Sequence, residues 1–98
     1  MLPERVLLAL TQEFDAFAAI KTVFLYGSYA RGAETPHSDI DLALLAPEMT
    51  KADFARLSYR ITWELPTLIP AEIVRLDGAA ADFRERVMKK GVVIYERK

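Results

Sequence analysis

The segment from residue 39 to residue 44 constrains the fold more than any other, because every second side chain in it is a large apolar one. The large apolar residues fall on one side of an extended chain: Ile40, Leu42 and Leu44. The other side receives Asp39, Asp41 and Ala43. Since side chains alternate between the two faces of a β-strand, we predict a strand over residues 39–46 with one buried face and carboxylates at its start.

The rest of the chain predicts helices and strands in alternation. Apolar residues at helical spacing predict helices over residues 3–19, 50–65 and 80–90. Short β-branched and aromatic runs predict strands over residues 22–26, 71–76 and 92–95. Residues 28–32 are expected to form a single helical turn, and residues 33–38 are expected to form an exposed loop. The expected fold class is therefore α/β (α+β), a mixed sheet of about four strands with helices packed on one face.

Length and composition limit the classes of protein to which the chain can belong. Its 98 residues suit one domain, and 52% hydrophobic with 28% charged residues is a globular balance. A net charge of −1 disfavours direct binding of nucleic acid through a broad basic surface. Cysteine is absent, which excludes disulfides and thiolate sites. The apolar runs fall short of a membrane span, and the acidic start is unlike a signal peptide, so we expect a cytoplasmic protein without membrane contact.

Two carboxylates stand together at the start of the strand over residues 39–46. Asp39 and Asp41 are two positions apart, so on a strand they point to the same side. Two negative charges this close repel each other unless a cation lies between them, and oxygen ligands favour Mg²⁺ or Mn²⁺. The alternative is a pair of solvated acids at a strand end.

A second polar feature precedes this pair. Gly27 and Ser28 end one predicted strand and open a helical turn, which offers backbone N–H groups and a hydroxyl to a phosphate. Arg31 is a further donor for the same phosphates. Ser28 could instead satisfy a turn amide, and Arg31 could be solvated. Beside a divalent-metal pair, this turn predicts metal-assisted transfer from a nucleoside triphosphate.

The remaining notable side chains have plainer interpretations. Tyr59 and Trp63, four apart on a predicted helix, are expected to pack rather than to stack on a base. His37, the only histidine, is expected to be exposed in its loop. Lys89 and Lys90 are expected to be a solvated helix end.

Taken together, Gly27-Ser28, ten residues and Asp39-x-Asp41 resemble the signature of the DNA polymerase beta type nucleotidyltransferases. The details, GSYARG followed by SDIDLALL, resemble the minimal nucleotidyltransferases (MNT), which are encoded beside HEPN-domain proteins. The first helix, the later strand with an acid and the final GVVIYE strand extend this resemblance over nearly the whole chain.

The resemblance implies a role for each motif residue. Gly27 and Ser28 would bind the triphosphate, and Asp39 and Asp41 would hold the metals. A third carboxylate, usually Asp on the next strand, would activate the attacking hydroxyl. Glu72 takes that place here, which is a departure from the family pattern. Asp77 competes for the role, but it precedes Gly78 in a turn signal, so we expect Glu72, a charge in an otherwise buried strand, to be the metal ligand or general base.

The function implied by the resemblance is that of an antitoxin enzyme. It would transfer AMP from ATP, with Mg²⁺ or Mn²⁺, to a tyrosine of a partner HEPN toxin. Two alternatives stay open: an antitoxin that binds and occludes its partner without catalysis, and nucleotidyl transfer to a small molecule.

Overall fold

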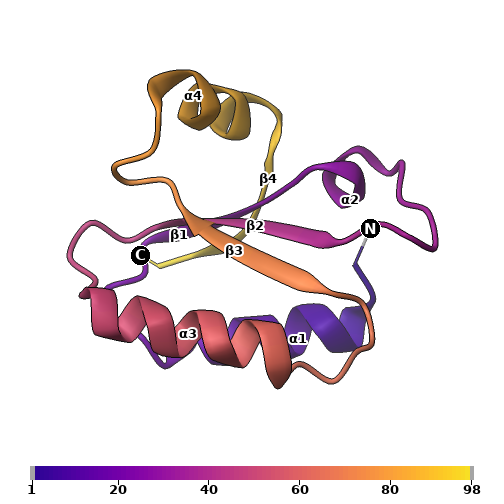
Figure 1. Ribbon diagram of the computed structural model, residues 1–98, viewed down its shortest axis with the longest axis horizontal. Coiled ribbons are helices and arrows are strands. Elements are labelled where there is room, and N and C mark those ends of the chain that lie inside the picture. The colour runs from indigo at the N-terminus through magenta and orange to yellow at the C-terminus, as the bar shows by residue number, and fades with distance from the viewer. Residues whose placement is uncertain (1, 98) are drawn as a thin grey trace.

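The computed structural model describes residues 2–97 as a sheet with helices on either side (Figure 1). The elements follow one another as α1 (Glu4–Asp15), β1 (Thr22–Tyr26), α2 (Ser28–Arg31), β2 (Ile40–Leu45), α3 (Lys51–Trp63), β3 (Ala71–Arg75), α4 (Ala81–Lys90) and β4 (Val92–Glu96). None of the helices in this described part of the chain has the length and apolarity needed to cross a membrane.

The four strands form one mixed sheet in the order β3-β2-β1-β4. Strand β1 runs antiparallel to both β2 and β4, whereas β2 and β3 are parallel. Parallel neighbours need a crossover connection, and α3 provides it. The predicted mixed sheet of about four strands is confirmed, and β3 lies at one edge of it.

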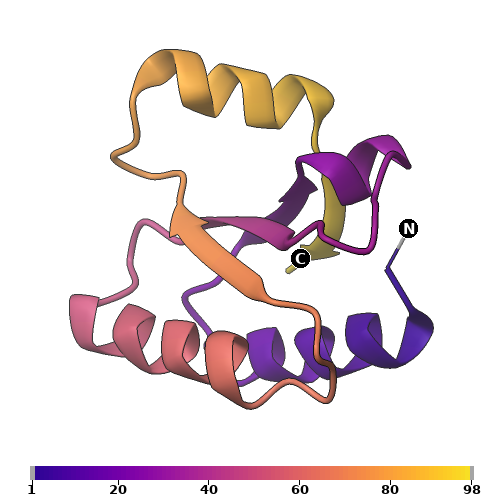
Figure 2. The same cartoon turned by 45° about the vertical axis from the view of Figure 1, so that its right-hand side comes forward.

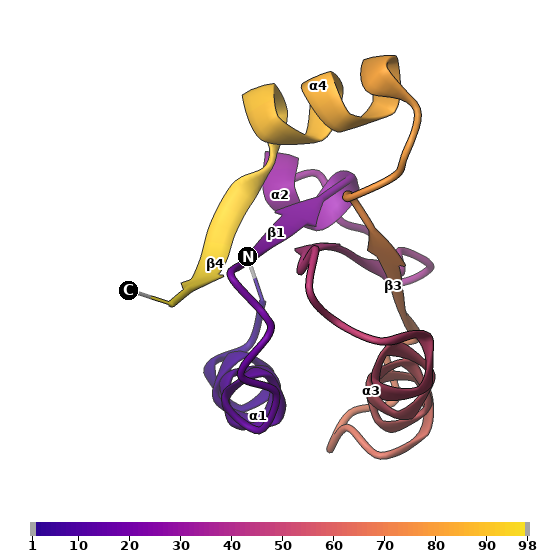
Figure 3. The ribbon, with the colours of Figure 1, turned by 90° about the vertical axis from the view of Figure 1, so that its left-hand side faces the viewer.

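Helices α1 and α3 cover one face of the sheet (Figure 3). The apolar side of β2 points toward them, and three of its side chains are fully buried there: Ile40, Leu42 and Leu44. The helices contribute Val6, Leu10, Phe14, Leu57 and Ile61 to the same core. The alternation over residues 39–44 therefore predicted the buried face of the strand correctly.

The opposite face is covered by α4, which corrects the expectation that all helices pack on one face (Figures 1 and 3). A second apolar cluster lies there, formed by Phe24, Ala43, Leu76 and Val87 with Phe83 packed against it. Phe83 and Val87 are four residues apart and so share one side of α4, and Phe24 and Ala43 offer them an apolar surface. The sheet is thus a middle layer.

Most element ends agree with their sequence signals. The Thr50 side chain accepts a hydrogen bond from the Asp53 N–H at 3.1 Å and so caps the start of α3, next to the predicted start at residue 50. The first helix is shorter than predicted: it ends at Asp15, and the turns that follow still bury Phe17 and Ile20. Strand β2 begins at Ile40, so Asp39 lies just before the strand rather than in it.

Candidate active site

The site is built around Asp41, the middle residue of a row that crosses three strands. We call this row the acidic row, and it consists of Tyr26, Asp41 and Glu72. Tyr26 on β1 and Glu72 on β3 are the direct partners of Asp41 in the sheet register. Paired residues on neighbouring strands project to the same face, so all three side chains share the face on which α4 packs. The two carboxylates predicted from different strands are therefore neighbours in the fold.

Gly27 brings the turn before α2 against this row. Its φ of 74° is in the region that favours glycine. A Cβ built on Gly27 would lie 2.5 Å from Oδ2 of Asp41, closer than two such atoms can stand. The absence of a side chain at residue 27 thus lets the Asp41 carboxylate lie directly against the backbone of the predicted phosphate-binding turn.

The row carries an excess of negative charge. The pKa of Asp41 is raised, first by burial and then by the charges of Asp39 and Glu72. The pKa of Tyr26 is also raised, by burial and by Asp41 and Glu72. After burial, both shifts are caused by the negative charges of this row, which a bound cation would offset.

The predicted metal ligands come from three positions around this row. Asp39 is exposed at the entry to β2, Asp41 is partly buried, and Glu72 is exposed on β3. Within residues 2–97 no three acidic or histidine side chains are grouped closely enough to enclose a metal ion. The oxygen chemistry and the uncompensated charge of the three carboxylates nevertheless suit a hard divalent cation.

Glu72 differs from its prediction in one respect. We expected a charge within a buried strand, but its side chain is exposed, whereas Ala71 and Ile73 beside it are buried on the other face of β3. The register that pairs it with Asp41 still places it on the site face. The assignment of Glu72 as metal ligand or base therefore rests on its pairing with Asp41 and not on burial of its charge.

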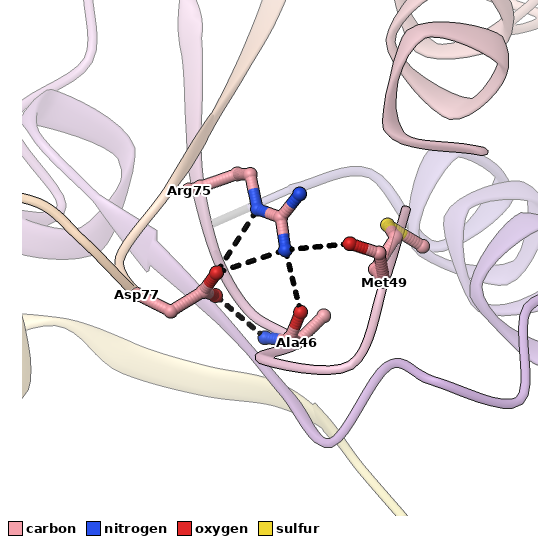
Figure 4. Close-up of polar contacts among 4 residues, drawn as sticks. All are labelled: Ala46, Met49, Arg75 and Asp77. Carbon is pink, nitrogen blue, oxygen red and sulfur yellow. Dashed lines mark hydrogen bonds and ion pairs between the residues drawn. The ribbon is translucent and has the colours of Figure 1, made fainter. Parts of the chain in front are cut away.

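Asp77, the competing acid, forms hydrogen bonds with the backbone of Ala46 and the side chain of Arg75 (Figure 4). Its carboxylate accepts hydrogen bonds from the Ala46 N–H at 2.8 Å and from Nε of Arg75 at 3.0 Å. Arg75 in turn donates to the carbonyl oxygens of Ala46, at 2.7 Å, and Met49, at 3.0 Å. Asp77 thus ties the end of β3 to the loop after β2, in agreement with its interpretation as a turn residue.

Ser28 and Arg31 are the first and last residues of α2. Ser28 is partly exposed beside Gly27, and Arg31 is exposed on the side of α2 that faces a pocket. His37 is exposed in its loop, as expected. Tyr59 and Trp63 do not pack as expected, because their exposed fractions are 60% and 72%.

A pocket between α2 and α4 was missed by the sequence analysis. It has a volume of about 280 Å³ and adjoins the acidic row at Tyr26 and Gly27. Figure 2 shows the end of α4 lying over α2 at this place. Its charged lining consists of Arg31, Arg86 and Lys90. The spacing of Arg86 and Lys90, which puts both on one side of a helix, is the signal that could have pointed to it.

Comparison with known proteins identifies the family to which the chain belongs. The family model described as polymerase beta, nucleotidyltransferase matches residues 9–98. No curated protein matches the chain.

Solved structures share the fold over nearly the whole chain. A chain in the crystal structure of a toxin–antitoxin with AMP-PNP is 23% identical, with a TM-score of 0.73, over 99% of this chain and 76% of that one. A chain of a toxin–antitoxin MntA–HpeT mutant is 25% identical, with a TM-score of 0.70, over 100% and 76% of the two chains. A chain in the complex of a tri-AMPylated Shewanella oneidensis HEPN toxin with an MNT antitoxin is 21% identical, with a TM-score of 0.62, over 92% and 66%.

Proposed function

Because the chain belongs to the polymerase beta nucleotidyltransferase family, we propose that it transfers AMP from ATP to a hydroxyl group and releases pyrophosphate. The observation that carries this proposal is the position of Asp41. It lies against Gly27 in the predicted phosphate-binding turn and in register with Glu72 on the neighbouring strand. One small region thereby combines a place for phosphate with two carboxylates.

The acidic row is the proposed binding place of the divalent cation. Asp39, Asp41 and Glu72 would hold Mg²⁺ or Mn²⁺, whose chemistry is to neutralise charge on the phosphate oxygens during transfer. The raised pKa of Asp41 supports this assignment, because after burial its causes are the negative charges of Asp39 and Glu72.

In the proposed reaction, the oxygen of the acceptor hydroxyl attacks the α-phosphorus of ATP. The bond from that phosphorus to the bridging oxygen of pyrophosphate breaks, and the hydroxyl proton passes to the carboxylate of Glu72. Ser28 and the backbone at Gly27 would orient the triphosphate, and Arg31 would balance its charge. Glu72 is exposed at the sheet edge, so an acceptor carried on another protein can reach it.

We propose a tyrosine of a HEPN toxin as the acceptor, which would make the chain an antitoxin that acts by AMPylation. Support comes from the similar chain found in a complex of a tri-AMPylated HEPN toxin with an MNT antitoxin. The AMP-PNP in another similar structure supports ATP as the donor.

The test is incubation of the purified chain with a HEPN-domain protein, Mg²⁺ and ATP labelled either at the α- or at the γ-phosphate. Transfer of AMP predicts label on the partner from α-labelled ATP only. A stable complex without label would instead support occlusion, and label on a small molecule without any protein acceptor would support the third alternative. A chelator should abolish the labelling, since the proposed reaction needs a divalent cation.

A further inference from the structure

The pocket between α2 and α4 lies on a defined side of the acidic row. Tyr26 and Gly27 line it, and Tyr26 is paired with Asp41, which is paired with Glu72. The order across the sheet face is therefore pocket, Asp41, Glu72. The pocket and the proposed base flank Asp41 from opposite sides.

The charges in the pocket have the opposite sign to those of the row. Arg31 comes from α2, and Arg86 and Lys90 come from successive turns of α4. Among residues 2–97, none of these three side chains forms an ion pair with a carboxylate. The guanidinium of Arg86 lies over an aromatic ring, 5.9 Å from the centre of Phe83.

The walls of the pocket are largely apolar. Phe83, Val87 and Ala30 lie between the three cations, and the rings of Phe83 and Tyr26 meet edge to face at 5.6 Å. Apolar walls exclude water, and charges interact more strongly where water is excluded. A compact, multiply charged anion is the ligand that suits unpaired cations over such a floor.

The favourable interaction of cations with the end of the α4 dipole does not explain why Lys90 lines the pocket. Lys89 and Lys90 both lie in the last turn of α4, where either cation suits the helix dipole. Only Lys90 lines the pocket, while Lys89 lies with Arg84 on the other side of the helix. The helix thus carries one Arg–Lys pair toward the site and a second pair away from it.

We propose that Arg86 and Lys90 of α4, on the far side of the pocket from Arg31, bind the two terminal phosphates of the nucleoside triphosphate, which leave as pyrophosphate. This inference rests on the proposed function. In phosphoryl and nucleotidyl transfer, the attacking and leaving oxygens stand roughly in line on opposite sides of the phosphorus. With the α-phosphate at Asp41 and the acceptor on the side of Glu72, the leaving group must lie on the side of the pocket. That is also the side on which it meets cations rather than carboxylates.

The test compares two double variants of the full chain with identical composition. Arg86→Gln with Lys90→Gln removes the inward pair, and Arg84→Gln with Lys89→Gln removes the outward pair, so both variants lose the same net charge. Binding of ATP, AMP and inorganic pyrophosphate, each with Mg²⁺, is measured by calorimetry. Since hydrogen bonds to charged groups contribute strongly, we expect the inward variant to weaken ATP and pyrophosphate binding by about tenfold or more, and the outward variant by less than about twofold.

AMP separates the terminal phosphates from the rest of the nucleotide. Its affinity should be the same in the wild type and both variants, because it lacks those phosphates. An equal loss of AMP and ATP affinity in the inward variant would assign the pocket to the nucleoside and overturn the proposal. Equal effects of the two variants, or no pyrophosphate binding by the wild type at millimolar concentration, would overturn it as well.

These outcomes are independent of whether AMP reaches an acceptor. Loss of pyrophosphate binding in the inward variant supports the pocket assignment even if no transfer is detected. Transfer with unchanged pyrophosphate binding refutes the pocket assignment and leaves the proposed function intact.

Discussion

Gly27 and Asp41 are in direct contact across the strand end, and the contact leaves no room for a side chain on Gly27. We therefore predict that Gly27→Ala displaces the Asp41 carboxylate and abolishes nucleotide transfer. The positive φ adds strain of about 1–2 kcal/mol for an L side chain. Enzyme assay and thermal unfolding measure the two effects separately.

Gly32→Ala is the matched control, because Gly32 also has a positive φ, of 68°, but open space where its Cβ would be. It should show the strain without the loss of transfer. Equal loss of transfer in both variants would show that backbone strain, rather than the contact with Asp41, is responsible.

Asp41→Asn should leave the fold intact and change how stability depends on pH. Burial and neighbouring carboxylates raise the pKa of Asp41 above its usual 3.8, so the folded state holds this proton more tightly than the unfolded state. The resulting stabilisation is present below pH 3.8 and is lost as the pH rises through the higher folded pKa. Without a divalent cation, the wild type should therefore lose stability relative to Asp41→Asn over this rise, as followed by denaturant unfolding. A constant difference would contradict the raised pKa.

Glu72 and Asp77 should respond in opposite ways to removal of their charge. Glu72→Gln is expected to lower transfer by about a hundredfold or more, the range for losing a positioned base, with little change in stability because the side chain is exposed. Asp77→Asn should keep the transfer rate and cost about 1 kcal/mol, since it weakens the contacts to Arg75 and Ala46. Steady-state rates and unfolding free energies are measured for both variants. A large loss of transfer in Asp77→Asn with none in Glu72→Gln would assign the base to Asp77.

The chain should form a stable complex with a HEPN-domain protein, burying about 1,000 Å² or more as specific interfaces do. Co-expression followed by size-exclusion chromatography checks this expectation. Elution of two separate species would count against a protein-borne acceptor.

The alternation of residues 39–44 and the short runs around it were sufficient to predict the sheet and most element bounds. They were insufficient for the side on which α4 packs, because periodicity shows that Phe83 and Val87 share a helix side but not which face of the sheet they cover. Exposure of Glu72 depends on which face of β3 the helices cover, and the apolar sequence neighbours of Glu72 do not reveal this because they lie on the other face. The pocket was missed for a related reason: Arg31 and Lys90 are distant in sequence and meet only through the packing of α2 and α4.

The central claim is that the carboxylates of the acidic row carry out transfer of AMP to a partner protein. It is tested most directly by the intact mass of the HEPN-domain partner after co-expression with the wild type or with Asp41→Asn. With the wild type, we expect a partner whose mass is increased by AMP, and with Asp41→Asn an unmodified partner in an intact complex. An unmodified partner with the wild type, or a modified partner with Asp41→Asn, would contradict it.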